Sequence, residues 1–203
     1  MSRTRFRRLI PSSYVFLLAT LSPTQAGVPI GAELVVVKNG INRVNLGGEI
    51  IEAMVILAHR DNFNAHSFER STFLIRTRTA ESDPEQWQIV PFEHGENGSH
   101  WKNDLEVSGG ADCQLHTFRL LRVSKENTIY VLIADRAPGK SFADSETVTF
   151  LYFKLTFNVD GLPGLPTAYF KLVQTENARK KYCDVNEAIK AELGLDGAIA
   201  PAK

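Results

Sequence analysis

Short runs of β-branched and aromatic residues, separated by turn residues, recur along most of this chain, a pattern typical of β-strands. Hydrophobic and polar positions alternate most clearly in 71–78 and 114–123, and the most apolar runs are 128–134 and 147–157. The other runs that predict strands are 33–38, 41–46, 50–58, 86–92 and 169–173. About nine strands joined by turns indicate an all-β fold, and of the two antiparallel architectures, sandwich and barrel, we favour the β-sandwich.

Two connections carry specific turn signals. Asn39–Gly40 lies between the first two strand runs, and Asn-Gly favours a tight hairpin because both residues tolerate positive φ. The segment 161–166 reads Gly-Leu-Pro-Gly-Leu-Pro. It has too many prolines for regular structure, so we expect a wide crossover loop.

One short terminal α-helix is predicted near the end of the chain. Asp184 can cap it, with Glu187 at the spacing of a capping box, and Gly194 is a suitable stop. The apolar positions that recur at helical intervals are Val185, Ala188, Ile189 and Leu193. We expect this helix to cover one end of the sandwich.

The first 26 residues have the order of a secretory signal peptide. Four arginines lie within 3–8, a mostly apolar run spans 9–21, and a small-residue site ends at Ala26. The apolar run is shorter than the roughly 20 residues that span a bilayer. We therefore predict a signal peptide over 1–26, one β-sandwich domain over 27–203, and a periplasmic protein.

Charge excludes some partners. The whole chain has 23 basic and 23 acidic residues, and removal of the signal takes away four arginines, leaving a formal charge of about −4. A mildly acidic domain lacks the basic surface that binds nucleic acid or an anionic membrane. No second apolar run approaches membrane length, so we expect no membrane span after signal removal.

The chain has two cysteines, Cys113 and Cys183. An even number in an exported protein indicates a disulfide, and the alternative is two buried free thiols. The bond would tie the C-terminal segment to the middle of the domain.

Motifs for catalysis are weak. Ser99 and Lys102 match the S-x-x-K pattern of penicillin-recognising enzymes, but they lie in a polar loop and no S-D-N or K-T-G follows. The five histidines (His59, His66, His94, His100 and His116) do not have zinc-site spacing. We therefore expect a protein that is not an enzyme.

A calcium-like site is the remaining chemical candidate, because hard divalent cations bind loop carboxylates and carbonyls. Asp135 ends a predicted strand, Asp144 follows a Pro-Gly turn, and Asp112 lies in a glycine-rich loop. These three are our candidate metal ligands; the alternative is that they are solvated loop residues.

Several segments together resemble one small family, the carbapenem intrinsic-resistance (CarG-like) proteins. The segments are 37–41 (VKNGI), 62–68 (NFNAHSF), 87–92 (WQIVPF), 108–113 (SGGADC), 118–121 (FRLL), 133–136 (IADR), 141–144 (SFAD) and 181–187 (KYCDVNE). The resemblance implies a periplasmic β-sandwich that forms homodimers and binds a cation. It also implies protection from carbapenems without hydrolysis, through contact with the drug or with a resistance-protein partner.

The same fold resembles periplasmic inhibitors of invertebrate-type lysozyme, which insert a Ser-Gly-x-x-Tyr loop into the enzyme's acidic cleft. Ser108–Ala111 begins like that loop, but Asp112 and Cys113 follow in place of a tyrosine. Carboxylates in the enzyme would repel Asp112. Lysozyme inhibition is therefore the alternative function.

Overall fold

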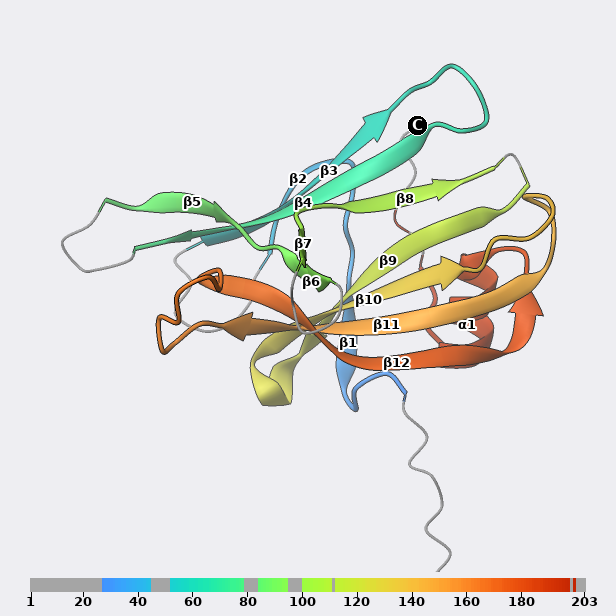
Figure 1. Cartoon of the computed structure of the whole chain (residues 1–203). Coiled ribbons are helices and arrows are strands. Elements are labelled where there is room, and N and C mark those ends of the chain that lie inside the picture. Colours follow the sequence, from blue (N-terminus) through green and yellow to red (C-terminus); the bar gives the residue numbers. More distant parts are fainter. Residues whose placement is uncertain are drawn as a thin grey trace, which may run out of the picture.

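The computed structural model describes residues 27–44, 52–78, 84–94, 100–110, 112–197 and 199. They form twelve strands and one C-terminal α-helix (Figure 1). The strands are β1 (Ala32–Val35), β2 (Gly40–Arg43), β3 (Glu52–Arg60), β4 (Phe68–Thr77), β5 (Gln86–Ile89), β6 (Phe92–His94), β7 (His100–Lys102), β8 (Leu105–Gly109), β9 (Gln114–Val123), β10 (Thr128–Arg136), β11 (Glu146–Phe157) and β12 (Ala168–Tyr182). A 3₁₀ turn, Ser124–Glu126, joins β9 to β10, and α1 spans Val185–Leu193.

The strands form two layers that one strand connects. The first layer contains β2, β3, β4 and β5, and the second contains β9 to β12 with β6, β7 and β1 (Figure 1). Strand β8 pairs with β4 through 105–107 and with β9 through 108–109, so it belongs to both layers. All pairings are antiparallel except the contact of β6 with β12. This arrangement confirms the predicted all-β fold with a short terminal helix.

A hydrophobic core fills the space between the layers. Val55, Leu57, Phe73 and Ile75 reach it from the first layer. From the second layer come Phe92, Phe118, Leu120, Val131, Phe153 and Phe170. Buried and partly exposed side chains alternate along β3 and β4 because only every second side chain of a strand faces the core.

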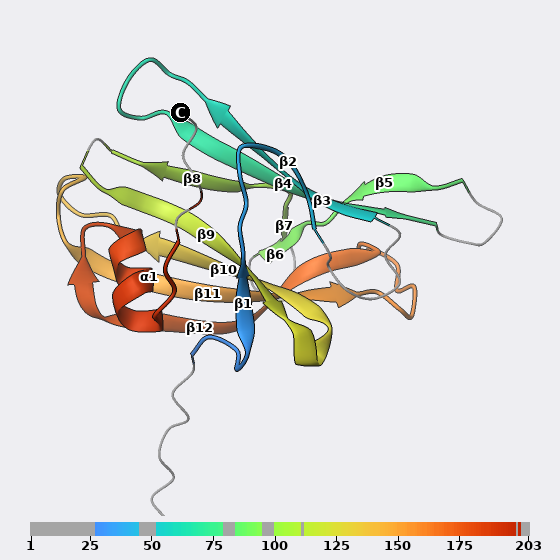
Figure 2. The ribbon, with the colours of Figure 1, turned by 180° about the vertical axis from the view of Figure 1, so that it is seen from behind.

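The opposite face of the second layer is covered by α1, and β1 crosses the same back surface (Figure 2). Val185, Ala188 and Ile189 are fully buried there against Leu121, Leu132 and Phe150. Asp184 caps the helix by accepting a hydrogen bond from the Asn186 amide, and Gly194 ends it with φ +67°. The predicted bounds and caps of this helix are confirmed.

Two predicted connections are wrong. The runs on either side of Asn39–Gly40 do not pair with each other, because β1 pairs with β9 and β2 pairs with β3. The turn, in which Gly40 has φ +102°, carries the chain from one layer to the other. The segment 161–166 is not a crossover, because it joins β11 and β12 as a hairpin in which Phe157 is paired with Ala168.

Some strands were missed or assigned wrong lengths. The last strand does not end at 173 but continues to Tyr182, paired with β11 over its whole length. The run 86–92 is two strands, β5 and β6, interrupted around Pro91. Trp87 on β5 is 43% exposed because this strand lies at the margin of the first layer.

The predicted signal peptide, 1–26, lies outside the described residues. No helix in the described ranges is long and apolar enough to cross a membrane.

Candidate functional site

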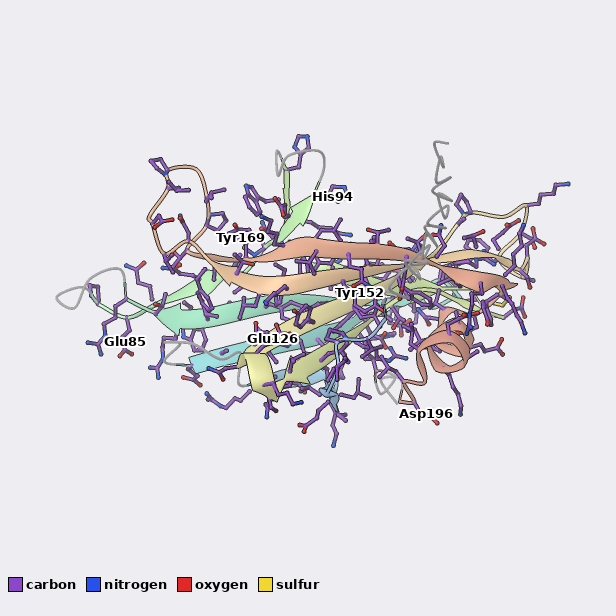
Figure 3. The ribbon with its side chains drawn as sticks, turned by 90° about the horizontal axis from the view of Figure 1, so that it is seen from below. Glu85, His94, Glu126, Tyr152, Tyr169 and Asp196 are labelled. Atoms are coloured by element: carbon purple, nitrogen blue, oxygen red, sulfur yellow. A yellow bond between two sulfur atoms is a disulfide. The ribbon has the colours of Figure 1, made fainter. Side chains whose placement is uncertain are left out.

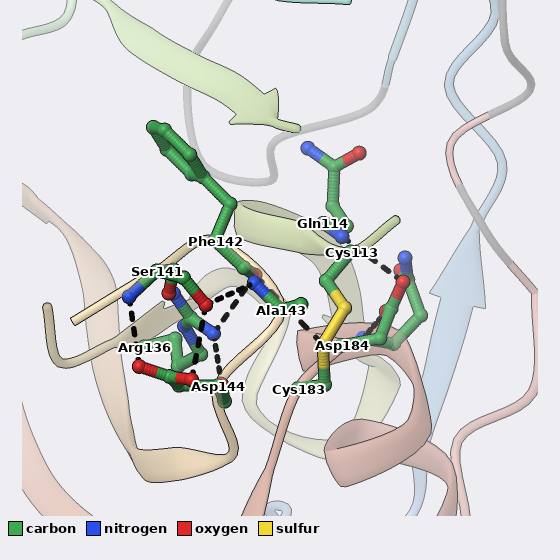
Figure 4. The surroundings of a disulfide bond; sticks show 10 residues. Cys113, Gln114, Arg136, Ser141, Phe142, Ala143, Asp144, Cys183 and Asp184 are labelled. Carbon is green, nitrogen blue, oxygen red and sulfur yellow. Dashed lines mark hydrogen bonds between the residues drawn. A yellow bond between two sulfur atoms is a disulfide. The ribbon is translucent and has the colours of Figure 1, made fainter. Parts of the chain in front are cut away.

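The two cysteines form the predicted disulfide (Figure 4). Cys113 precedes β9 and Cys183 precedes α1, and their Cα atoms are 5.7 Å apart. Hydrogen bonds reinforce the link: the Gln114 amide donates to Asp184, and the Arg119 guanidinium donates to the Asn186 side chain at 2.7 Å. Burial lowers the pKa of Arg119 to about 10, so it stays charged at neutral pH. The start of the helix is therefore fixed to the start of β9.

The three aspartates predicted to bind a cation do not come together. The described residues contain no group of three or more His, Cys, Asp or Glu side chains placed to hold a metal ion. Asp112 is exposed in the loop between β8 and β9, and Asp135 is paired with His116. A divalent cation remains a prediction, but these three residues do not assemble into one ligand set.

Asp144 has a local structural role. Its carboxylate accepts hydrogen bonds from the backbone N–H and the hydroxyl of Ser141, and the first of these is the main cause of its lowered pKa. The buried Arg136 donates to the carbonyl oxygens of Asp144, Phe142 and Ser141 (Figure 4). The loop from β10 to β11 is thus closed around a guanidinium.

A concave site lies where the β6–β7 hairpin approaches β8, β9, β10 and β11. It is a cleft of about 300 Å³, a volume at the lower end of the range for small-molecule sites. We name it the hairpin cleft. Its lining residues are Phe92, Glu93, His94, Lys102, Leu105, Glu106, His116, Thr117, Phe118, Ile133, Asp135, Leu151 and Phe153. His94 lies on the side of the molecule away from α1 and Asp196 (Figure 3).

Apolar side chains form the floor of the hairpin cleft. Phe92 stacks on Phe170 with ring centroids 4.7 Å apart and meets Phe153 edge-on at 5.4 Å. Phe118 and Ile133 are cross-strand neighbours on β9 and β10. The floor is therefore the outer margin of the inter-layer core, held rigidly by the packing below it.

A histidine–aspartate pair lies on the rim. His116 and Asp135 are directly opposite each other on β9 and β10, and His116 Nδ1 lies 2.7 Å from Asp135 Oδ1. Because a carboxylate can only accept a hydrogen bond, the contact places a proton on Nδ1 and leaves Nε2 available to a ligand. Both side chains are about two-fifths exposed, 41% and 42%, so a molecule in the cleft can reach them.

The rest of the rim combines both signs of charge. Arg70 donates to Glu106 at 3.0 Å and to Asp104 at 2.9 Å, so the two carboxylates share one guanidinium. Lys102 ends β7 and is exposed, and within the described ranges it forms no ion pair. The cleft therefore offers an anionic ligand an uncommitted cation next to an apolar floor.

Sequence reasoning identified only part of this cleft. Asp135 was selected as a metal ligand, and Lys102 appeared only within the S-x-x-K match. Lys102 lies on a strand, whereas the penicillin-recognising arrangement requires the serine and lysine one helical turn apart. Ser99 lies outside the described residues. The pairing of His116 with Asp135 depends on strand register, which no local pattern in the sequence reveals.

The loop that resembles a lysozyme-inhibitor segment follows β8. Ser108 and Gly109 are the last residues of that strand, and a Cβ on Gly109 would collide with the carbonyl oxygen of Cys113. The loop is thus a tight connection next to the disulfide. Inhibition of lysozyme stays a prediction.

Comparisons with known proteins place the chain in a family. A family model described as "Carbapenem resistance protein CarG-like" matches residues 37–191, more than half of the chain. A solved structure, "Crystal structure of CarG", has the same fold with a TM-score of 0.61 and 22% identity, covering 84% of this chain and 99% of that one. No curated protein matches the chain. The region matched by the family model includes the whole hairpin cleft and both cysteines, and the chain belongs to the CarG-like family of carbapenem resistance proteins.

Proposed function

We propose that this protein protects cells from carbapenems in the periplasm by binding the drug in the hairpin cleft, without hydrolysing it. Family membership supports a role related to carbapenem resistance. The observation that carries the binding proposal is the uncommitted Lys102 beside an apolar floor in a cleft of about 300 Å³. Carbapenems are small bicyclic β-lactams that carry a carboxylate, so they have both an apolar surface for the floor and an anion for the lysine.

The geometry supports specific roles for the rim residues. Lys102 would bind the drug carboxylate, and the available Nε2 of His116 would hydrogen-bond a hydroxyl or carbonyl group of the drug. Asp135 holds the imidazole in one orientation through the 2.7 Å contact. Phe92 and Phe118 would contact the bicyclic ring. These are binding roles, and stoichiometric capture would leave the drug chemically intact.

Lys102→Glu is expected to weaken carbapenem binding at least tenfold. The substitution replaces attraction of the drug carboxylate by repulsion, and a hydrogen bond to a charged group contributes roughly 1.5–3 kcal/mol. Isothermal titration calorimetry of the purified protein measures the change. Lys125→Glu is the matched control, since Lys125 is an exposed lysine in the 3₁₀ turn and does not line the cleft.

The cellular experiment compares the signal-bearing protein with a signal-deleted form in a susceptible Gram-negative strain, while the drug in the medium is assayed. Protection that requires the signal and leaves the drug intact supports the proposal. Loss of drug in step with protection would favour catalysis. Equal affinity of the Lys102→Glu variant and wild type would place the binding site elsewhere.

A further inference from the structure

A second pocket lies on the opposite side of the molecule from the hairpin cleft, beside α1. It is an open pocket of about 640 Å³, and three parts of the chain that are distant in sequence meet there. Gly27 and Val28 precede β1, Glu176 and Arg179 belong to β12, and Glu192 belongs to α1. We name it the N-terminal pocket. Figures 1 and 2 both show the segment before β1 beside β12.

The charges in this pocket are unequal. Glu192 accepts hydrogen bonds from Arg179 Nε at 2.6 Å and from the Tyr182 hydroxyl at 2.8 Å, and the Arg179 contact lowers the pKa of Glu192. Glu176 accepts a hydrogen bond from the buried hydroxyl group of Tyr152 at 2.7 Å. Burial and this bond raise the pKa of Tyr152, which therefore remains a donor. Two carboxylates and one guanidinium thus line the pocket, and the guanidinium is bonded to Glu192.

Gly27 contributes only backbone atoms to this pocket because it has no side chain. The next residue, Val28, packs against the apolar cluster beneath α1 and so anchors the segment. Cleavage after Ala26 would add water across the peptide bond, giving Ala26 a carboxylate and Gly27 an ammonium group. The new positive charge would arise at a pocket that has one carboxylate more than its cations can balance.

We propose that the N-terminal pocket binds the protein's own α-ammonium group, created when the signal peptide is removed. The ammonium of Gly27 neutralises the excess charge of Glu176 and Glu192 and adds a bond between the N-terminal segment, β12 and α1. Removal of the signal peptide thereby adds a stabilising contact to the folded domain. This inference rests on the proposed export, through the cleavage position, but it does not depend on carbapenem binding.

The expected pH dependence follows from the groups that face the ammonium: Glu176 and Arg179 on β12, Glu192 on α1, and the hydroxyl groups of Tyr152 and Tyr182. An unperturbed α-amino group has a pKa of about 7.7–8.0, and the excess carboxylate raises it in the folded protein. The added stability is therefore fully present below about pH 7.7 and is lost as the pH rises through the higher folded pKa.

The test uses protein that begins at Gly27, prepared by cutting a fusion directly before that residue so that export is not required. The pKa of the Gly27 amine is read by NMR titration of ¹³C-labelled glycine. We expect it to lie about half a unit or more above the unperturbed range, and to return to that range in Glu176→Gln/Glu192→Gln. Glu187→Gln, on α1 but outside the pocket lining, should leave the raised value unchanged.

Thermal unfolding gives a second readout. Retaining Ala26 moves the amine by one residue, about 3.5 Å. At pH 6–7, this form and an N-acetylated form should have melting temperatures about 2–4 °C below that of the Gly27 form. At a pH above the folded pKa of the amine, all three forms should have the same melting temperature. An unshifted Gly27 pKa in the wild type overturns the inference. A raised Gly27 pKa that persists in the double variant also overturns it. If the double variant fails to fold, the wild type is titrated in 1 M salt, and a raised pKa that persists there overturns the inference.

Discussion

Replacing both cysteines, as Cys113→Ala/Cys183→Ala, is expected to lower the free energy of unfolding by about 4 kcal/mol. The disulfide closes a loop with a sequence separation of 70 residues, and the chain-entropy model gives about this loss for such a loop. For a domain of this size the melting temperature should fall by roughly 8–16 °C. Urea unfolding followed by circular dichroism measures the change.

The native fold should survive this substitution, because the contacts of Asp184 with Gln114 and of Asn186 with Arg119 still hold the helix to β9. Reductant provides the control: it should destabilise the wild type by a similar amount and leave the double variant unaffected. A loss below about 1 kcal/mol would show that the unfolded chain is already restricted near these residues.

Phe92→Ala is expected to cost about 3–5 kcal/mol, the usual range for truncating a buried phenylalanine. Phe92 is 2% exposed and its ring contacts those of Phe73, Phe153 and Phe170. It also pairs with Phe170 at the single register position that joins β6 to β12. Few other contacts hold this three-residue strand, so the hairpin that carries Lys102 should lose its position as well.

Phe92→Leu is the comparison variant, since it keeps most of the apolar volume and should cost much less. Chemical unfolding measures both stabilities, and calorimetry with a carbapenem measures binding under folding conditions. Phe92→Ala should weaken binding more than Phe92→Leu. If the alanine variant were as stable as the wild type, the hairpin would be held by contacts other than this aromatic cluster.

The features predicted correctly from sequence were those set by local patterns. The alternation from Gln114 to Val123 gave the bounds of β9, and the capping residues Asp184 and Gly194 gave those of α1. The polar half of β12 was missed because residues 174–182 have no strong strand preference of their own. Pairing with β11 holds them extended, an instance of tertiary context determining secondary structure.

The candidate site shows the same division. The cysteine pairing followed from composition, because only two cysteines are present. The hairpin cleft could not be predicted in this way. It is formed by Lys102 on β7, His116 on β9 and Asp135 on β10, and the order of these strands is set by the whole fold. The three aspartates were grouped by residue type and loop placement, but Asp135 is paired with His116 on the neighbouring strand and Asp144 bonds Ser141 within its own loop.

The outer strands have a consequence for the proposed function, in which the protein captures the drug. A stoichiometric protector has to be as abundant as the drug it binds, and crowded β-proteins aggregate through exposed strand edges. The path of paired strands in the described part of the chain ends in β2, of four residues, and β7, of three. The side-chain amide of Asn42 on β2 donates hydrogen bonds to the backbone carbonyl groups of Lys38, Gly40 and Val55. Edges this short offer an incoming strand few backbone groups to pair with, but within the described residues β12 beyond Phe170 pairs with β11 alone. The outer side of β12 is therefore the edge that limits how concentrated the protein can become before copies pair with each other.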